Sequence, residues 1–216
     1  MHTLEAKSLA KTIKKTKIVH DISLLVKSKE IVGLLGPNGA GKTTSFYMVC
    51  GLTDATEGEV LLDGEEITKL PLSSRAQMGI GYLPQESSIF KDLTVEENLL
   101  IAAEAQNLDT EKVQPRIEKL LEIFNIEPIR NRLGIRLSGG ERRRVEIARA
   151  LVGEPKFLLL DEPFSHIDNS NIEIVSRIID SELETKINLT SAQLWFILLV
   201  TLKSIKTFKE TVILIC

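Results

Sequence analysis

A glycine-rich segment from Gly36 to Thr43 carries the clearest chemical pattern in the sequence. It reads GPNGAGKT and fits G-x-x-x-x-G-K-[ST], in which glycines allow backbone N–H groups to surround a phosphate. The apolar stretch Glu30–Leu35 predicts a buried strand before it, and a helical pattern follows, so the phosphate would also meet the positive end of a helix. Lys42 would reach the β- and γ-phosphates, and Thr43 would hold Mg²⁺. This context disfavours the alternative of a glycine-rich turn that binds nothing.

Two adjacent carboxylates, Asp161 and Glu162, follow the apolar segment Phe157–Leu160. At the end of a buried strand, Asp161 would hold Mg²⁺ through water, and Glu162 would orient or deprotonate an attacking water. By itself, an apolar strand followed by two acids is also typical of a strand that meets a solvated loop. Downstream of a phosphate-binding loop, the same pattern becomes strong evidence for these two roles.

A third segment, LSGGE, predicts the beginning of a helix and consists of Leu137, Ser138, Gly139, Gly140 and Glu141. Exposed N–H groups at such a helix start could bind a second phosphate. Taken alone, the segment is more typical of a helix start capped by its serine, without a ligand. Both interpretations stay open at this point.

The elements around these motifs alternate between strands and helices. Strand patterns cover 18–26, 30–35, 59–62, 79–83 and 156–160, and a mostly helical stretch of about fifty residues interrupts them from Thr94 onward. Thr94 and Glu97 have the spacing of a capping box. The 216 residues therefore predict one α/β domain with an inserted helical sub-domain.

Composition and charge exclude several classes of protein. With 43% hydrophobic and 26% charged residues, the chain is expected to be globular rather than disordered or fibrous. A net charge of −3 provides no general field for nucleic acid, so we expect no direct contact with it. Cys50 and Cys216 form no ligand cluster, and the longest apolar run, Leu194–Val200, is far shorter than the roughly 20 residues of a spanning helix. We therefore expect a cytoplasmic protein.

From about Leu4 to Ile179 the sequence resembles the ATP-binding cassette (ABC) ATPases. The phosphate loop is similar to Walker A, Gln85 to the Q-loop glutamine, LSGGE to the ABC signature and FLLLDEP to Walker B. The resemblance implies a P-loop NTPase core with a mixed or parallel sheet, an antiparallel β sub-domain and a helical sub-domain at about 86–140. We expect this ABC domain to span 1–184.

Within that family, Gly33–Leu52, Gly79–Leu99 and Leu137–Leu151 resemble the ATPases of lipopolysaccharide exporters in Gram-negative bacteria. ATPases of branched-chain amino-acid importers share much of the signature helix and remain an alternative. The resemblance implies a peripheral protein on the cytoplasmic face of the inner membrane, in contact with it only through integral membrane subunits. Soluble ABC ATPases of translation or DNA repair usually have two fused cassettes or a long coiled coil, and neither pattern is present.

The resemblance also assigns roles to individual residues. ATP would contact Gly36, Pro37, Asn38, Gly39, Ala40, Gly41, Lys42, Thr43 and Thr44. Ile13 stands where the family usually has an aromatic residue that stacks on adenine. Catalysis would use Glu162, Gln85 and Lys42, and the Mg²⁺ ligands would be Thr43, Gln85 and Asp161.

Two further roles require a second protein. In a homodimer, the residues of LSGGE would bind the ATP of the other subunit, near the D-loop aspartate Asp168. Phe90 would anchor the membrane subunit, although packing within the helical sub-domain is an equally good interpretation of this side chain.

The C-terminal segment 185–216 departs from the family. The chain has only His2, His20 and His166, so the family's switch histidine, which contacts the γ-phosphate, is missing. A shifted reading frame near residue 183 would explain this, and a diverged tail that still forms the last strands is the rival hypothesis. Without the histidine we expect a subunit that binds ATP but hydrolyses it slowly or not at all.

Overall fold

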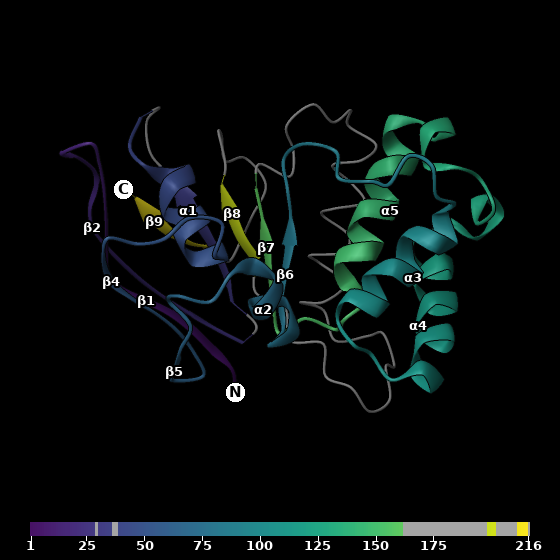
Figure 1. Ribbon diagram of the computed structural model, residues 1–216, viewed down its shortest axis with the longest axis horizontal. Helices are drawn as coiled ribbons and strands as arrows, with labels where there is room; N and C mark the ends of the chain where they lie inside the picture. Colours follow the sequence, from purple (N-terminus) through teal and green to yellow (C-terminus); the bar gives the residue numbers. More distant parts are fainter. Residues whose placement is uncertain (29, 36–38, 162–197, 202–210, 216) are drawn as a thin grey trace.

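The computed structural model describes residues 1–28, 30–35, 39–161, 198–201 and 211–215, whose arrangement is shown in Figure 1. The strands are β1 (Thr3–Ile13), β2 (Thr16–Lys27), β3 (Ile31–Leu35), β4 (Glu57–Leu62), β5 (Glu65–Glu66), β6 (Ile80–Leu83), β7 (Phe157–Leu160), β8 (Leu198–Thr201) and β9 (Thr211–Ile215). The helices are α1 (Lys42–Cys50), α2 (Leu72–Gln77), α3 (Val95–Ala105), α4 (Thr110–Ile123), α5 (Gly139–Leu151) and the short 3₁₀ helices η1 (Glu127–Ile129) and η2 (Gly134–Arg136).

The strands form two sheets. The first is antiparallel, has the order β2-β1-β4-β5, and begins with the long hairpin β1–β2. The second has the order β6-β7-β8-β3-β9, and its paired strands run parallel. Strands β8 and β9 come from the atypical tail, and both pair with β3. The predicted α/β architecture with an antiparallel sub-domain is confirmed.

Strands β6 and β7 lie between two hydrophobic clusters. In β7, Leu158 and Leu160 pack with α3, α4 and α5, whereas Phe157 and Leu159 pack with α1 and the antiparallel sheet. All four residues of β7 are buried, as the continuous apolar pattern predicted. One short strand therefore joins the two halves of the molecule, because its alternate side chains serve different clusters.

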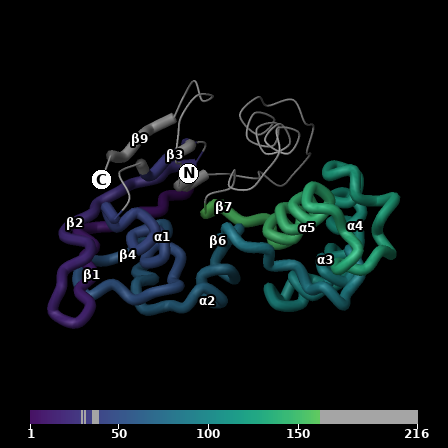
Figure 2. Tube along the Cα trace, turned by 90° about the horizontal axis from the view of Figure 1, so that it is seen from above, coloured from purple at the N-terminus to yellow at the C-terminus, as the bar shows by residue number. Residues whose placement is uncertain are grey.

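Helices α3, α4 and α5 gather at one end of the molecule, on the far side of β6 and β7 from the antiparallel sheet (Figures 1 and 2). The predicted capping box is present at the start of α3, where Thr94 Oγ1 accepts from Glu97 N and Glu97 Oε2 accepts from Thr94 N. The pair thus provides hydrogen-bond acceptors for two backbone N–H groups at the start of the helix, which have no partners within the helix.

A buried arginine that the sequence patterns did not predict fixes the end of α1. The side chain of Arg75 is only 1% exposed, and burial lowers its pKa. Its guanidinium donates to the carbonyls of Met48 (3.0 Å) and Val49 (2.6 Å) at the end of α1, and to those of Thr68 and Leu70, both at 2.8 Å. A cation at the negative end of α1 is favourable, and the four carbonyls compensate for its burial.

Replacing Arg75 with methionine should therefore destabilise the fold, because buried carbonyls would lose a charged donor. We expect Arg75→Met to lower the free energy of unfolding by about 3 kcal/mol and the Tm by roughly 10 °C, measured by thermal and urea unfolding. Arg136 is exposed, so Arg136→Met is the matched control and should stay within about 0.5 kcal/mol of the parent. Equal stability of both variants would contradict this role of Arg75.

Candidate functional site

The motifs predicted from the sequence follow three strands of one parallel sheet. Gly36 follows β3, Gln85 lies two residues after β6, and Asp161 directly follows β7. Since β6 pairs in parallel with β7, and β8 joins β7 to β3, the carboxyl ends of these strands share one edge of the sheet. The amide of Asp161 donates to Leu83 O at 3.0 Å, which fixes the ends of β6 and β7 beside each other. Ligands of open parallel sheets bind at this edge.

The described part of the phosphate loop has the backbone that its glycines allow. Gly39 and Gly41 have φ values of +84° and +85°. A Cβ on Gly41 would lie 3.0 Å from Val19 Cγ2 and 3.2 Å from Ile18 O, so a side chain here would need β2 to move slightly and would also be strained by the positive φ. Gly36, Pro37 and Asn38 lie outside the described residues.

Helix α1 begins at Lys42, immediately after this loop, and Thr43 and Thr44 occupy its first turn. Ala40 and Gly41 precede it, and glycine provides no side chain that could cap the first N–H groups of the helix. These N–H groups together with the helix dipole favour an anion at this position. The arrangement agrees with a phosphate site built from Lys42 and the turn before it.

The carboxylate of Asp161 lies in a polar cluster that includes a residue the sequence reasoning missed. Asp161 is 2% exposed, and the phenols of Tyr47 in α1 and Tyr82 in β6 lie near its carboxylate. Burial, followed by the negative charge of Asp161, raises the pKa of Tyr47 and of Tyr82. Both phenols therefore stay protonated at neutral pH. Residues of α1 and β6 thus lie beside the Asp161 carboxylate.

The signature segment is a capped helix start that also has an exposed backbone. Ser138 caps α5: its Oγ accepts from Glu141 N at 3.3 Å, and Glu141 Oε2 accepts from Ser138 N at 2.9 Å. That backbone donor, followed by the Ser138 hydroxyl, lowers the pKa of Glu141. Leu137 is buried in the helical cluster, whereas a Cβ on Gly139 would meet nothing within 4 Å. Helix α5 therefore begins with two glycines, and the space beside the first of them, Gly139, is open.

Phe90 lies on the loop between β6 and α3, and its side chain is 48% exposed. Its backbone N–H donates to Asn98 Oδ1 at 2.9 Å, and its carbonyl accepts from Asn98 Nδ2 at 3.0 Å. A Cβ on Gly134 would lie 2.6 Å from Phe90 O, so η2 packs directly against the same backbone. These contacts hold the backbone of Phe90 so that about half of its side chain is exposed. Asn98 was missed because a polar residue on the apolar face of a helix resembles an interruption of the pattern.

The other residues predicted for the site either lie away from the ends of β3, β6 and β7 or fall outside the residues that the structure describes. Ile13, at the end of β1, is 46% exposed, so its side chain is accessible to a planar ligand. Glu162 and Asp168 lie outside the described residues, so their positions stay predictions.

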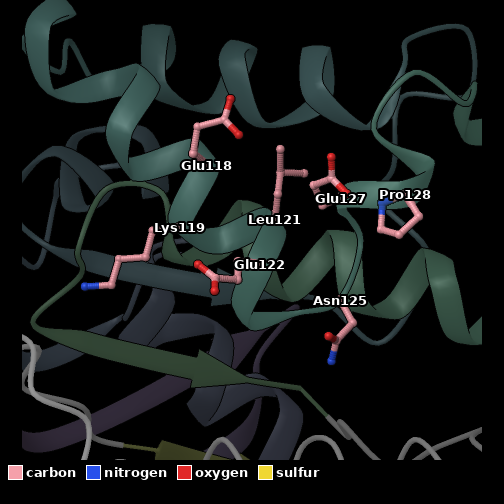
Figure 3. Close-up of a pocket in the computed structure, with 7 residues that line it drawn as sticks. All are labelled: Glu118, Lys119, Leu121, Glu122, Asn125, Glu127 and Pro128. Carbon is pink, nitrogen blue, oxygen red and sulfur yellow. The ribbon is translucent and has the colours of Figure 1, made fainter.

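A surface depression of about 600 Å³, drawn in Figure 3, is a different feature from this site. It is lined by residues of α4 and of the chain around η1, namely Glu118, Lys119, Leu121, Glu122, Asn125, Glu127 and Pro128. None of the predicted nucleotide-binding residues is among them. Three glutamates in the lining would repel the phosphates of a nucleotide.

Comparison with known proteins identifies the family. Residues 19–165 match the family model described as ABC transporter, which is more than half of the chain. The chain belongs to the ABC transporter family. No helix within the described residues has the length and apolar character needed to cross a membrane.

Two relatives within the ABC family have closely similar sequences. The lipopolysaccharide export system ATP-binding protein LptB of Haemophilus influenzae is 56% identical over 180 residues, which cover 83% of this chain and 75% of that protein. LptB of Escherichia coli K12 is 53% identical over 181 residues, with the same coverage.

Solved structures of ABC proteins share the fold. The ADP conformation of the ATP-binding cassette MJ1267 matches with a TM-score of 0.77 at 25% identity, over 93% of this chain and 81% of that one. A dimeric cassette, MJ0796 with bound ADP and phosphate, matches with a TM-score of 0.75 at 26% identity, over 92% and 87%. The predicted ABC ATPase fold and the predicted ATP-binding, ATP-hydrolysing activity are confirmed. The expectation of impaired hydrolysis is not borne out by these comparisons.

Proposed function

We propose that this chain is the ATP-binding subunit of a lipopolysaccharide exporter and powers transport by hydrolysing ATP. The observation that carries this proposal is the identity of 56% and 53% with two LptB proteins over most of the chain. The common edge of β3, β6 and β7 supports it, because Lys42, Gln85 and Asp161 all follow those strands. We further propose that the ABC domain spans 1–184, with a helical sub-domain at about 86–140, and is followed by an atypical C-terminal tail at 185–216, whose strands β8 and β9 pair with β3.

Hydrolysis would proceed by in-line attack of water on the γ-phosphate, in which positioning and neutralisation of charge provide most of the catalysis. The N–H groups of the phosphate loop and Lys42 bind the phosphates, and Ile13 offers an exposed apolar contact for the adenine. Glu162 accepts the proton of the attacking water, and Gln85 helps to position that water. Tyr47 orients the Asp161 carboxylate from the side of α1.

The residues proposed for Mg²⁺ have suitable donor chemistry. Thr43, Gln85 and Asp161 offer a hydroxyl, an amide and a carboxylate oxygen, and Mg²⁺ prefers oxygen ligands combined with substrate phosphates. When bound with ATP, Mg²⁺ neutralises charge on the β- and γ-phosphate oxygens. Asp161 is almost fully buried, so its carboxylate is held at the site rather than spread over solvent-exposed conformations.

A homodimer would complete each nucleotide site. The exposed Gly139 and the N–H groups at the start of α5 would bind the ATP held by Lys42 of the second subunit, next to the D-loop residue Asp168. The likeness to a cassette solved as a dimer with ADP and phosphate supports this arrangement. The subunit would lie on the cytoplasmic face of the inner membrane, bound through Phe90 to integral membrane subunits and not to nucleic acid.

Nucleotide binding should depend on Lys42, because its charge faces the phosphates. A charge-assisted contact contributes roughly 1.5–3 kcal/mol, so Lys42→Ala should weaken MgATP binding about ten- to a hundred-fold in a titration followed by calorimetry. Lys112 of α4 is an exposed lysine outside the site, and Lys112→Ala should bind MgATP like the parent. Parent-like affinity of the Lys42→Ala protein would rule out the proposed phosphate site.

Binding to the membrane subunits should depend on Phe90, because an aromatic anchor often carries about 2 kcal/mol of an interface, or roughly 30-fold in Kd. We expect Phe90→Ala to bind MgATP normally but to lose affinity for the co-expressed membrane subunits of the exporter, measured by pulldown and surface plasmon resonance. Leu52 is similarly exposed but follows α1, so Leu52→Ala serves as the control. Undiminished capture by the Phe90→Ala protein would show that the ring is not an anchor.

A further inference from the structure

Three side chains on one face of α5 contact the loop that carries Gln85 and Phe90. They are Arg143, Glu146 and Arg149, spaced three residues apart, so they follow one another along the helix. All three donate to or accept from residues between Pro84 and Ser88. The signature helix and the Q-loop are therefore joined by a line of polar contacts.

Glu146 is the centre of this line and is only 3% exposed. Its Oε1 accepts from Ser87 Oγ at 2.6 Å and from Ser88 N at 3.1 Å. Its Oε2 accepts from Arg143 Nη1 at 3.2 Å, and the same nitrogen donates to Pro84 O at 3.1 Å. Both carboxylate oxygens thus bind groups that belong to, or are fixed against, the Q-loop.

The position of this carboxylate has a physical cost that its contacts must offset. Its neighbours Val145, Ile147 and Ala148 are apolar and buried, so Glu146 is a charged residue on the core side of a helix. A buried charge is tolerated only when it is paired and hydrogen-bonded, and the Arg143 cation with two loop donors meets that condition. Removing the carboxylate would leave the Ser88 N–H without its partner.

The same line extends to the exposed anchor. Arg149 donates from Nη2 to Ser88 Oγ, and its guanidinium carbon lies 5.3 Å from the centre of the Phe90 ring. Gln85 and Phe90 are therefore at opposite ends of a loop held on α5, and α5 begins at the signature glycines. A displacement of Phe90 would be transmitted to α5 and to Gln85 through a few short contacts.

We propose that Glu146 is a positioning residue that makes the Q-loop and the signature helix move as one unit. This role rests on the proposed function, which gives Gln85 its place at the nucleotide and Phe90 its place at the membrane subunit. Glu146 does not touch the nucleotide. It acts through Ser87 and Ser88, so its loss should slow turnover without weakening the binding of ATP.

The test compares four variants of the full chain. Glu146→Ala removes both sets of contacts, whereas Glu146→Gln keeps an oxygen that can accept from Ser87 and Ser88. Ser87→Ala removes the shortest hydrogen bond of Glu146. Because Ser87 is exposed, this variant is expected to fold even where Glu146→Ala is unstable. Glu118→Gln, in the ion-pair network with Arg130, is the control for loss of a carboxylate elsewhere in the helical sub-domain.

Steady-state MgATP hydrolysis and amide exchange at Ser88 are the measurements. Glu146→Ala and Ser87→Ala should lower kcat about 3- to 30-fold, the range seen for residues that couple sites, with KM within about two-fold of the parent. Glu146→Gln should restore most of kcat, and Glu118→Gln should match the parent. Exchange at the Ser88 amide, measured without nucleotide, should be faster in Glu146→Ala and close to the parent in Glu146→Gln.

The two proposals fail in different ways. Parent-like kcat in both Glu146→Ala and Ser87→Ala, from an active parent, would overturn the role of Glu146 and leave the proposed function intact. A loss of thermal stability without a change in kcat would likewise reduce Glu146 to a structural residue. A parent chain that neither binds nor hydrolyses MgATP would contradict the proposed function and this role with it.

Discussion

The parallel pairing of β6 with β7, in the same sheet as β3, is the constraint on which the site depends. It brings residues distant in sequence to one edge: the start of α1 after the phosphate loop, Gln85 after β6 and Asp161 after β7. The hydrogen bond from Asp161 N to Leu83 O fixes two of these strand ends, and Tyr47 of α1 lies near the Asp161 carboxylate. A change of register in β7 would turn its alternate side chains to the wrong clusters and displace the carboxylate.

The same two strands also connect the nucleotide edge to the helical sub-domain. One face of β7 packs on the cluster around α1, and the other packs on α3, α4 and α5. Beyond this apolar contact, Glu146 and its neighbours hold the Q-loop on the signature helix. The part of the molecule that we propose binds phosphate and the part that presents Phe90 therefore share both a hydrophobic core and a polar connection, as expected of an ABC subunit that acts with a membrane partner.

The sequence predicted the elements whose patterns are local. The buried strand β7, the capping box of α3 and the loop before Lys42 could be read from apolar runs, cap spacing and glycines. Arg75 and Glu146 could not, because each is a polar residue buried by partners distant in the sequence, 27 residues away for Met48 and 59 for Ser87. The partners of Asn98 are close in sequence, but periodicity predicts an apolar side chain at its buried position on α3. The pairing of the tail strands could not be predicted from local patterns either, because β8 and β9 pair with β3, which lies more than 150 residues earlier in the sequence.

The central claim is that MgATP is hydrolysed at the edge formed by β3, β6 and β7, with Glu162 as the base. Phosphate release measured for the parent and for Glu162→Gln tests it most directly. An amide cannot accept the proton of the attacking water, so the variant should bind MgATP like the parent and release phosphate about 10²–10⁴-fold more slowly. Equal rates of phosphate release in the two proteins would contradict this account of the site.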